Sequence, residues 1–110
     1  GYAFEHNQIS EVTFRSKIEE INGAAFRSNQ ITRIDFSKSN NLKKIDSSAF
    51  YNNSLTNIEI PSSVTTIGNN VFDNNTGLES ITINGKSKSS EFDKLGTNWN
   101  GTCTNIIYSK

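Results

Sequence analysis

The side chains able to perform acid–base, nucleophilic or metal chemistry are few and widely separated in this sequence. His6 is the only histidine, and no Ser, Cys or Asp stands at a spacing that would make it a catalytic base, so we expect it in an exposed loop. Cys103 is the only cysteine and cannot form an internal disulfide, so we expect a small buried side chain. No phosphate loop, paired-glycine fingerprint, metal-ligand cluster or nucleophile elbow occurs. We therefore predict no enzyme, no catalytic residue, no metal site and no cofactor.

Other chemically suggestive groups each have a structural alternative. Asn52, Asn74 and Asn100 begin glycosylation sequons, which matter only in a glycosylating secretory host and are also expected by chance in an Asn-rich chain. Trp99 and Tyr108 suit either a sugar-stacking platform or the apolar cover of a domain end, and we favour the cover. The acidic residues Glu19, Glu20 and Asp46 have Lys43 and Lys44 as potential partners on an adjacent coil, worth about 0–1 kcal/mol as solvated pairs.

The charge balance excludes several partner classes. The 110 residues carry 11 basic and 11 acidic side chains, so the net charge is zero and nothing steers the chain toward nucleic acid or an anionic membrane. No apolar run reaches the roughly 20 residues that would insert across a bilayer, and we expect any export signal or anchor to lie outside this sequence. The hydrophobic fraction of 33% is low for a single globular core but sufficient for stacked coils.

A repeat organises most of the chain. Each of four copies has a small residue followed by Phe, an Asn three residues after the Phe, and an apolar triplet. The start-to-start spacings of 22, 24 and 22 residues are typical of a solenoid. The copies begin at Ala3-Phe4, Ala25-Phe26, Ala49-Phe50 and Val71-Phe72; the asparagines are Asn7, Asn29, Asn53 and Asn75; the triplets are Ile9/Val12/Phe14, Ile31/Ile34/Phe36, Leu55/Ile58/Ile60 and Leu78/Ile81/Ile83.

The pattern within a copy predicts its local structure. Each triplet ends in apolar–polar alternation rich in Ile, Val and Phe, which predicts short strands that stack in parallel: Glu11–Phe14, Arg33–Phe36, Asn57–Ile60 and Ser80–Ile83. The small-residue–Phe pair favours a tight turn of helix or 3₁₀-helix. We expect the four asparagines to form a structural ladder, in which each amide bonds the backbone of adjacent coils. The extra residues of the longer copy lie at 37–41, an exposed polar turn.

The repeat stops after Ile83. We assign residues 1–84 to the solenoid, with about four repeats and a truncated first copy, and residues 85–110 to a C-terminal cap of the same domain. Ser90 and Asp93 resemble a capping box that would open a short helix through Leu95. A last strand is expected over 105–108. The truncated N-terminal end offers a possible surface for self-association.

One copy allows a family comparison. The stretch from Ile58 to Phe72, IEIPSSVTTIGNNVF, resembles the BspA-like class of leucine-rich repeats, L-x-x-I-x-I-P-x-S-V-x-x-I-G-x-x-A-F, and residues 2 to 83 follow it more loosely. Pro61 and Gly68 have no counterparts in the other copies, and Asn stands where many family members have Cys. The resemblance implies an α/β-type, right-handed, β-rich leucine-rich-repeat solenoid. It also implies a secreted or cell-surface bacterial protein that functions in adhesion.

We expect a non-catalytic interaction module whose partner is a protein or glycoprotein, such as a host extracellular-matrix or plasma protein. The alternatives are a carbohydrate- or cell-wall-binding accessory module and a structural spacer. If the segment binds a partner, period-two alternation places the contact on the residues that project outward from the strands. These residues are Glu11, Thr13, Arg33, Asp35, Asn57, Glu59, Ser80 and Thr82.

Overall fold

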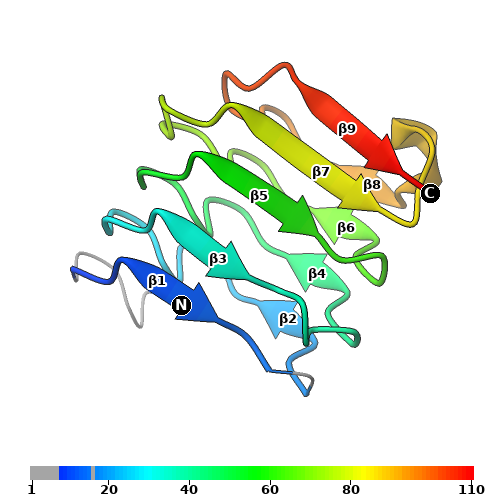
Figure 1. The fold of residues 1–110 in the computed structure, drawn as a ribbon, viewed down its shortest axis with the longest axis horizontal. Coiled ribbons are helices and arrows are strands. Elements are labelled where there is room, and N and C mark those ends of the chain that lie inside the picture. The colour runs from blue at the N-terminus through cyan, green and yellow to red at the C-terminus, as the bar shows by residue number, and fades with distance from the viewer. Residues whose placement is uncertain (1–7, 16) are drawn as a thin grey trace.

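The computed structural model describes residues 8–15 and 17–110 and shows a solenoid of stacked coils with two strand layers (Figure 1). The predictions for Ala3, Phe4, His6 and Asn7 lie outside the described residues. The front layer contains the longer strands, and the back layer contains two-residue strands. In chain order the strands are β1 (Glu11–Thr13), β2 (Glu20–Ile21), β3 (Arg33–Asp35), β4 (Lys44–Ile45), β5 (Asn57–Ile60), β6 (Thr66–Ile67), β7 (Ser80–Asn84), β8 (Lys94–Leu95) and β9 (Ile106–Ser109).

All strand pairs are parallel, as stacking of equivalent segments requires. In the front layer β1 pairs with β3, and β5, β7 and β9 pair in that order; in the back layer β2, β4, β6 and β8 form a continuous sheet. The register matches repeat positions, since Val12 lies opposite Ile34 and Ile58 opposite Ile81. The parallel-strand solenoid predicted from the sequence is therefore confirmed, with strand ends shifted by at most one residue from those expected.

The core lies between the two strand layers and is built from the repeat's apolar positions. Phe50 and Phe72 are almost fully buried, and their rings stack in line with that of Phe26 at centroid distances of 6.1 Å (Phe50–Phe72) and 5.5 Å (Phe26–Phe50). Phe14 and Phe36, which follow β1 and β3, form a second stacked pair at 5.2 Å. Because each coil contributes one ring to this stack, the core is thin but continuous. A low hydrophobic fraction is therefore enough to form it.

The small-residue–Phe segments differ from the expectation of helix or 3₁₀-helix. They are hydrogen-bonded turns in which non-glycine residues adopt positive φ, including Ser48 (59°) and Asn52 (60°) around Phe50. This geometry points their amides at the next coil: Ser48, Phe50 and Asn52 donate to carbonyls of the following coil at 2.9, 3.1 and 2.9 Å. The same pattern recurs from Ala24, Phe26 and Ser28. A helix would have used these amides within the turn, so stacking rather than local propensity decides the conformation.

The segment from Gly85 continues the stack. β8 extends the back sheet, β9 extends the front layer, and Asn70 and Phe72 donate to the carbonyls of Thr97 and Trp99. The predicted helix through Leu95 is wrong. A single 3₁₀ turn, η1 (Ser89–Glu91), forms without a side-chain cap, and Leu95 pairs with Ile67 instead.

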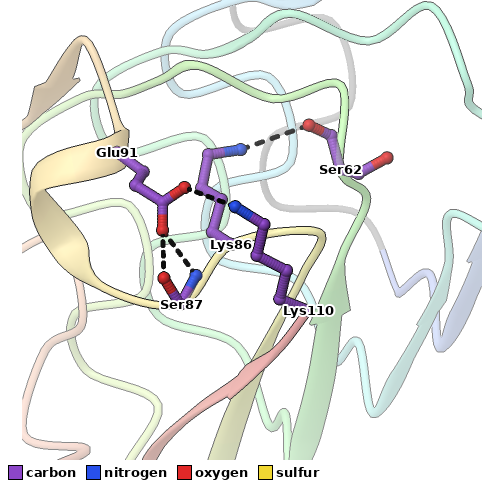
Figure 2. A network of polar contacts seen from close by, with 5 residues as sticks. All are labelled: Ser62, Lys86, Ser87, Glu91 and Lys110. Atoms are coloured by element: carbon purple, nitrogen blue, oxygen red, sulfur yellow. Dashed lines mark hydrogen bonds and ion pairs between the residues drawn. The ribbon is translucent and has the colours of Figure 1, made fainter.

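A polar network fastens this C-terminal segment to the coils below it (Figure 2). The buried Lys86 ammonium donates to the carbonyls of Ser62 at 3.2 Å and Val64 at 2.7 Å and lies 4.6 Å from the Phe92 ring centroid. Burial lowers the pKa of Lys86. Glu91 accepts hydrogen bonds from the Ser87 hydroxyl and amide and contacts Lys110 at 3.3 Å. Lys86 thus ties the segment to the loop after β5.

Glycine is required where coils approach most closely. A Cβ on Gly68 would lie 2.5 Å from the Ser47 amide nitrogen of the preceding coil, and one on Gly96 would lie 2.5 Å from the Asn69 amide nitrogen. These two glycines occupy equivalent positions, because Gly68 donates to Ile45 and Gly96 to Ile67. Gly68 therefore has a counterpart in the C-terminal segment that the four-copy repeat did not include.

Candidate interaction surface

The outer surface of the front layer presents the predicted binding residues in two rows. Along each strand, buried or half-buried aliphatic residues alternate with exposed or half-buried polar ones, so the polar side chains share one face. The pairing places Glu11 opposite Arg33, Thr13 opposite Asp35, Asn57 opposite Ser80 and Glu59 opposite Thr82. We call this surface the front face.

Three further residues extend the front face beyond those predicted. Asn84 continues the row on β7, Ile107 lies opposite Thr82, and Ser109 lies opposite Asn84. Ile107 is an exposed large hydrophobic side chain at 43% accessibility. The alternation of β9 indicates this, since Ile106 and Tyr108 are half-buried while Ile107 and Ser109 are exposed. It was missed because that segment was interpreted only as a cap.

The front layer is interrupted between β3 and β5. No strand pairing joins these two neighbours within the described residues, although the back sheet is continuous through β4 and β6 at the same junction. The interruption opens a groove of about 620 Å³. Its lining includes the outward side chains of both strands, the loop residues Ser37 and Asn40 after β3, and Pro61 and Ser62 after β5. The groove therefore lies within the front face.

The loop after β3 is the longest such connection among the first three coils. Eight residues lie between Phe36 and Ile45, whereas six lie between Ile60 and Ile67. Ser37 and Asn40 belong to this longer loop and line the groove. The adjoining asparagine side of the coil stays closed, because the Ser54 amide donates to the Ile31 carbonyl at 2.9 Å. The groove is therefore confined to the part of the coil that contains β3 and β5.

Carboxylates and one guanidinium define the charge of the groove. Arg33 and Asp35 come from β3 and Glu59 from β5. Hydrogen bonds from the Ser37 hydroxyl and amide, then the nearby Arg33 and Lys38, hold the pKa of Asp35 below its ordinary value, so it is ionised at neutral pH. Asn84 donates to Glu59 at 3.4 Å. Among the described residues, no hydrogen bond or ion pair crosses from a β3 side chain to a β5 side chain.

The asparagines of the predicted ladder lie on a different side of the coil from the front face, just after the Phe turns. Asn53 is buried, and its amide nitrogen donates to the carbonyls of Phe26 at 2.9 Å and Phe50 at 3.0 Å, while its oxygen accepts from Ile31 at 3.1 Å. Asn75 repeats this geometry one coil later, donating to Phe50 and Phe72 and accepting from Leu55. Asn29 donates to Phe26 at 3.0 Å.

The exposed asparagines form a second, outer row. Asn74 donates to the side chain of Asn52 at 2.8 Å, and Asn52 donates to Ser28 at 3.3 Å. Both asparagines have positive φ. Elsewhere Trp99 and Tyr108 pack as half-buried side chains against the core, and Cys103 is buried. The Lys44–Glu20 pair lies at 3.8 Å with both side chains slightly less than half exposed.

The described residues contain no group of three or more His, Cys, Asp or Glu side chains that could hold a metal ion. In the same part of the chain, no helix has the length and apolarity needed to cross a bilayer.

Comparison with known proteins defines the class. A family model described as the BspA type leucine-rich repeat region, in 6 copies, matches residues 1–106. The chain therefore belongs to the BspA-type leucine-rich-repeat family. This family points to repeat proteins with protein-interaction or surface roles, and its solenoid fold is typically non-catalytic. Searches among curated proteins and among solved structures returned no match.

Proposed function

We propose that this domain is a non-catalytic adhesion module of a secreted or cell-surface bacterial protein and that its front face binds a protein or glycoprotein. The observation that carries the proposal is the polar front face, where outward side chains from β1, β3, β5 and β7 form rows and those of β3, β5 and β7 line a groove. Extended surfaces of this kind are the part of a solenoid that binds partners. Extracellular-matrix and plasma proteins are the partners to examine first, because adhesion is the role that BspA-like repeats imply.

The mixed charge of the front face determines the expected behaviour. Arg33 and Glu59 are exposed, Asp35 is half-buried, and all three line the same groove, so each contributes a weak, salt-sensitive contact. Several such contacts acting together, or several repeats in a longer array, would supply the affinity. We therefore expect binding that weakens as ionic strength rises.

A charge-reversal variant tests the proposal. The wild-type domain and the variant Arg33→Glu, Asp35→Lys, Glu59→Lys are compared for binding to immobilised extracellular-matrix and plasma proteins, after circular dichroism has shown equal folding. A control with the same change in net charge, Lys43→Glu, Glu19→Lys, Glu20→Lys, alters the region around β2 and β4. Loss in the first variant alone supports the front face. Equal binding by both variants moves the site elsewhere, and no binding by the wild type makes the domain a spacer.

A further inference from the structure

Three asparagines of this chain are directly followed by glycine. In such a pair the glycine amide nitrogen can attack the asparagine side chain, because glycine has no side chain of its own to hinder the approach. The attacking group is a main-chain amide, so its hydrogen bonds in the stacked coils decide whether it is free to react. The three pairs are Asn22-Gly23, Asn84-Gly85 and Asn100-Gly101.

Two of the three glycine amides are already hydrogen-bonded. The Gly85 amide donates to the Ser109 carbonyl at 2.8 Å, and the Gly101 amide donates to the Asn98 carbonyl at 3.0 Å. Both preceding asparagine side chains are half-buried and donate hydrogen bonds of their own. Reaction at either pair therefore requires a local opening that first breaks these bonds.

The Gly23 amide has no hydrogen-bond partner among the described residues, and the side chain of Asn22 is exposed. The equivalent amides of the next three coils all have partners, since those of Ser47, Asn69 and Thr97 donate to side-chain oxygens at 2.8, 3.2 and 2.8 Å. Within the described part of the chain, the first of these four equivalent positions is thus the one with an accessible nitrogen.

The main chain at this position brings a side chain close to the following amide. Asp46 is the equivalent of Asn22 one coil later, and the carbonyls of both accept from the amide three residues on at 3.2 Å. In this turn a carboxylate oxygen of Asp46 lies 2.8 Å from the Ser47 amide nitrogen. An asparagine carboxamide is isosteric with that carboxylate, so the same side-chain conformation brings the carbon to be attacked next to the Gly23 nitrogen.

We propose that Asn22 is a deamidation site and that the folded domain directs the reaction to it. The Gly23 nitrogen, after giving its proton to hydroxide, forms a bond to the side-chain carbon Cγ of Asn22. The bond from Cγ to Nδ2 breaks, and ammonia leaves with a proton taken from water. Water then opens the resulting succinimide ring at either carbonyl, which gives aspartate or isoaspartate without any oxidation or reduction.

The isoaspartate product changes the contact between coils. It adds one methylene group to the main chain directly before Gly23. The next amides along the chain, those of Ala24 and Phe26, donate to the Ser47 and Ala49 carbonyls at 3.0 and 2.9 Å. Lengthening the main chain shifts these donors relative to the next coil and loosens the stack there. The turn follows the back strand β2, so the inference is independent of the function proposed for the front face.

The rates at the three asparagines test the proposal. The intact domain is incubated at mildly alkaline pH in water enriched in the heavy oxygen isotope, which marks conversion that occurs during the incubation. Mass spectrometry of proteolytic peptides then gives each rate. Asn22 should convert at least about threefold faster than Asn84 or Asn100, whose reaction requires the loss of a hydrogen bond. In denaturing urea the three rates should become similar.

Two variants extend the test. Gly23→Ala hinders the attacking nitrogen and should slow the conversion of Asn22; its Cβ would lie 3.3 Å from the Ser47 carbonyl oxygen, so circular dichroism first checks that it folds. Asn22→Asp introduces the charge without lengthening the main chain. Hydrogen exchange at Ala24 and Phe26 should therefore be faster in the purified isoaspartate form than in Asn22→Asp.

The inference is overturned if the folded domain converts Asn84 or Asn100 as fast as Asn22. It is equally overturned if Asn22 stays intact in the folded domain over an incubation that converts it in urea. A lead of Asn22 that persists unchanged in urea would also contradict it, because the order of rates would then come from the local sequence and not from the fold.

Discussion

At the residue scale, Asn53 joins three backbone segments through one side chain. Its amide bonds two carbonyls from adjacent coils and an amide from the coil before it, all in a buried turn. We expect Asn53→Ala to lower the free energy of unfolding by about 1–3 kcal/mol, because the neighbouring backbone groups would be left unsatisfied. Urea denaturation of the variant and the wild type measures the difference.

The adjacent Asn52 supplies the control for this prediction. Its side chain is exposed, but its backbone has φ of 60°, so replacement by Ala would add strain unrelated to the amide. Asn52→Gly removes the side chain and keeps the conformation accessible. We expect it to change the denaturation midpoint much less than Asn53→Ala does, and a larger effect at position 52 would mean that the outer row carries the stability.

Phe50 lies at the centre of the ring file and is fully buried between Phe26 and Phe72. Because neighbours on both sides are fixed by their own coils, the site cannot collapse around a smaller side chain. Phe50→Ala should therefore cost about 3–5 kcal/mol of stability. Thermal unfolding monitored by calorimetry tests this, and an unchanged transition temperature would be incompatible with the central position of Phe50.

At the element scale, the turn containing η1 depends on an ionised carboxylate. Hydrogen bonds from the Ser87 hydroxyl and amide, with a smaller contribution from Lys110, lower the pKa of Glu91 to about 2 from an ordinary value of 4.5. A carboxyl with a lower pKa in the folded state stabilises that state above the unfolded pKa. This contribution is present above about pH 4.5 and is lost as the pH falls toward about 2.

The variant Glu91→Gln should consequently be less stable than the wild type at pH 7, and the two stabilities should converge as the pH approaches 2. Denaturant midpoints at a series of pH values provide the measurement. Ser87→Ala removes the strongest hydrogen bond, so an NMR titration of that variant should show a higher pKa for Glu91. Parallel pH curves for wild type and Glu91→Gln would show that the Ser87–Glu91 contact does not form in solution.

Elements differ in how well the sequence predicts them. The front strands were predictable because Ile58 and Ile60 or Ile81 and Ile83 alternate with polar residues at a fixed repeat position. The predicted helix at Ser90 failed because a local cap pattern competes with pairing of Leu95 to Ile67, which becomes available only in the stacked fold. Positive φ at Ser48 likewise has no local signal, since it serves bonds to the next coil.

The candidate site was predictable only in part. Alternation placed Arg33, Asp35, Asn57 and Glu59 on one face, and the extra residues at 37–41 were visible as a longer turn. A longer turn does not indicate which side of the coil widens, because the added length can bulge into solvent without moving the strands. The separation of β3 from β5 is a property of the assembled coils and has no sequence signature of its own.

At the scale of the whole molecule, stability depends on neighbours, since each coil buries its apolar residues against the coils on either side. Ile81 and Ile83 are fully buried, with β9 paired to β7 and the side chains of Phe92, Trp99 and Cys103 contributing to the same core. The C-terminal segment also satisfies the β7 edge, because the Ile81 amide donates to the Asn105 carbonyl at 3.1 Å. Removing it would expose both an apolar surface and an open strand edge.

A chain ending at Asn84 should therefore associate or aggregate, because exposed edges of parallel strands and apolar surface both favour intermolecular contact. Light scattering and binding of a hydrophobic dye over a range of concentrations measure this, with the chain ending at Tyr108 as the control that keeps both β8 and most of β9. The shorter chain should show concentration-dependent mass and dye binding while the control remains like the wild type. A monomeric, cooperatively folded chain ending at Asn84 would show that the coils up to β7 are self-sufficient and that the C-terminal segment serves another purpose.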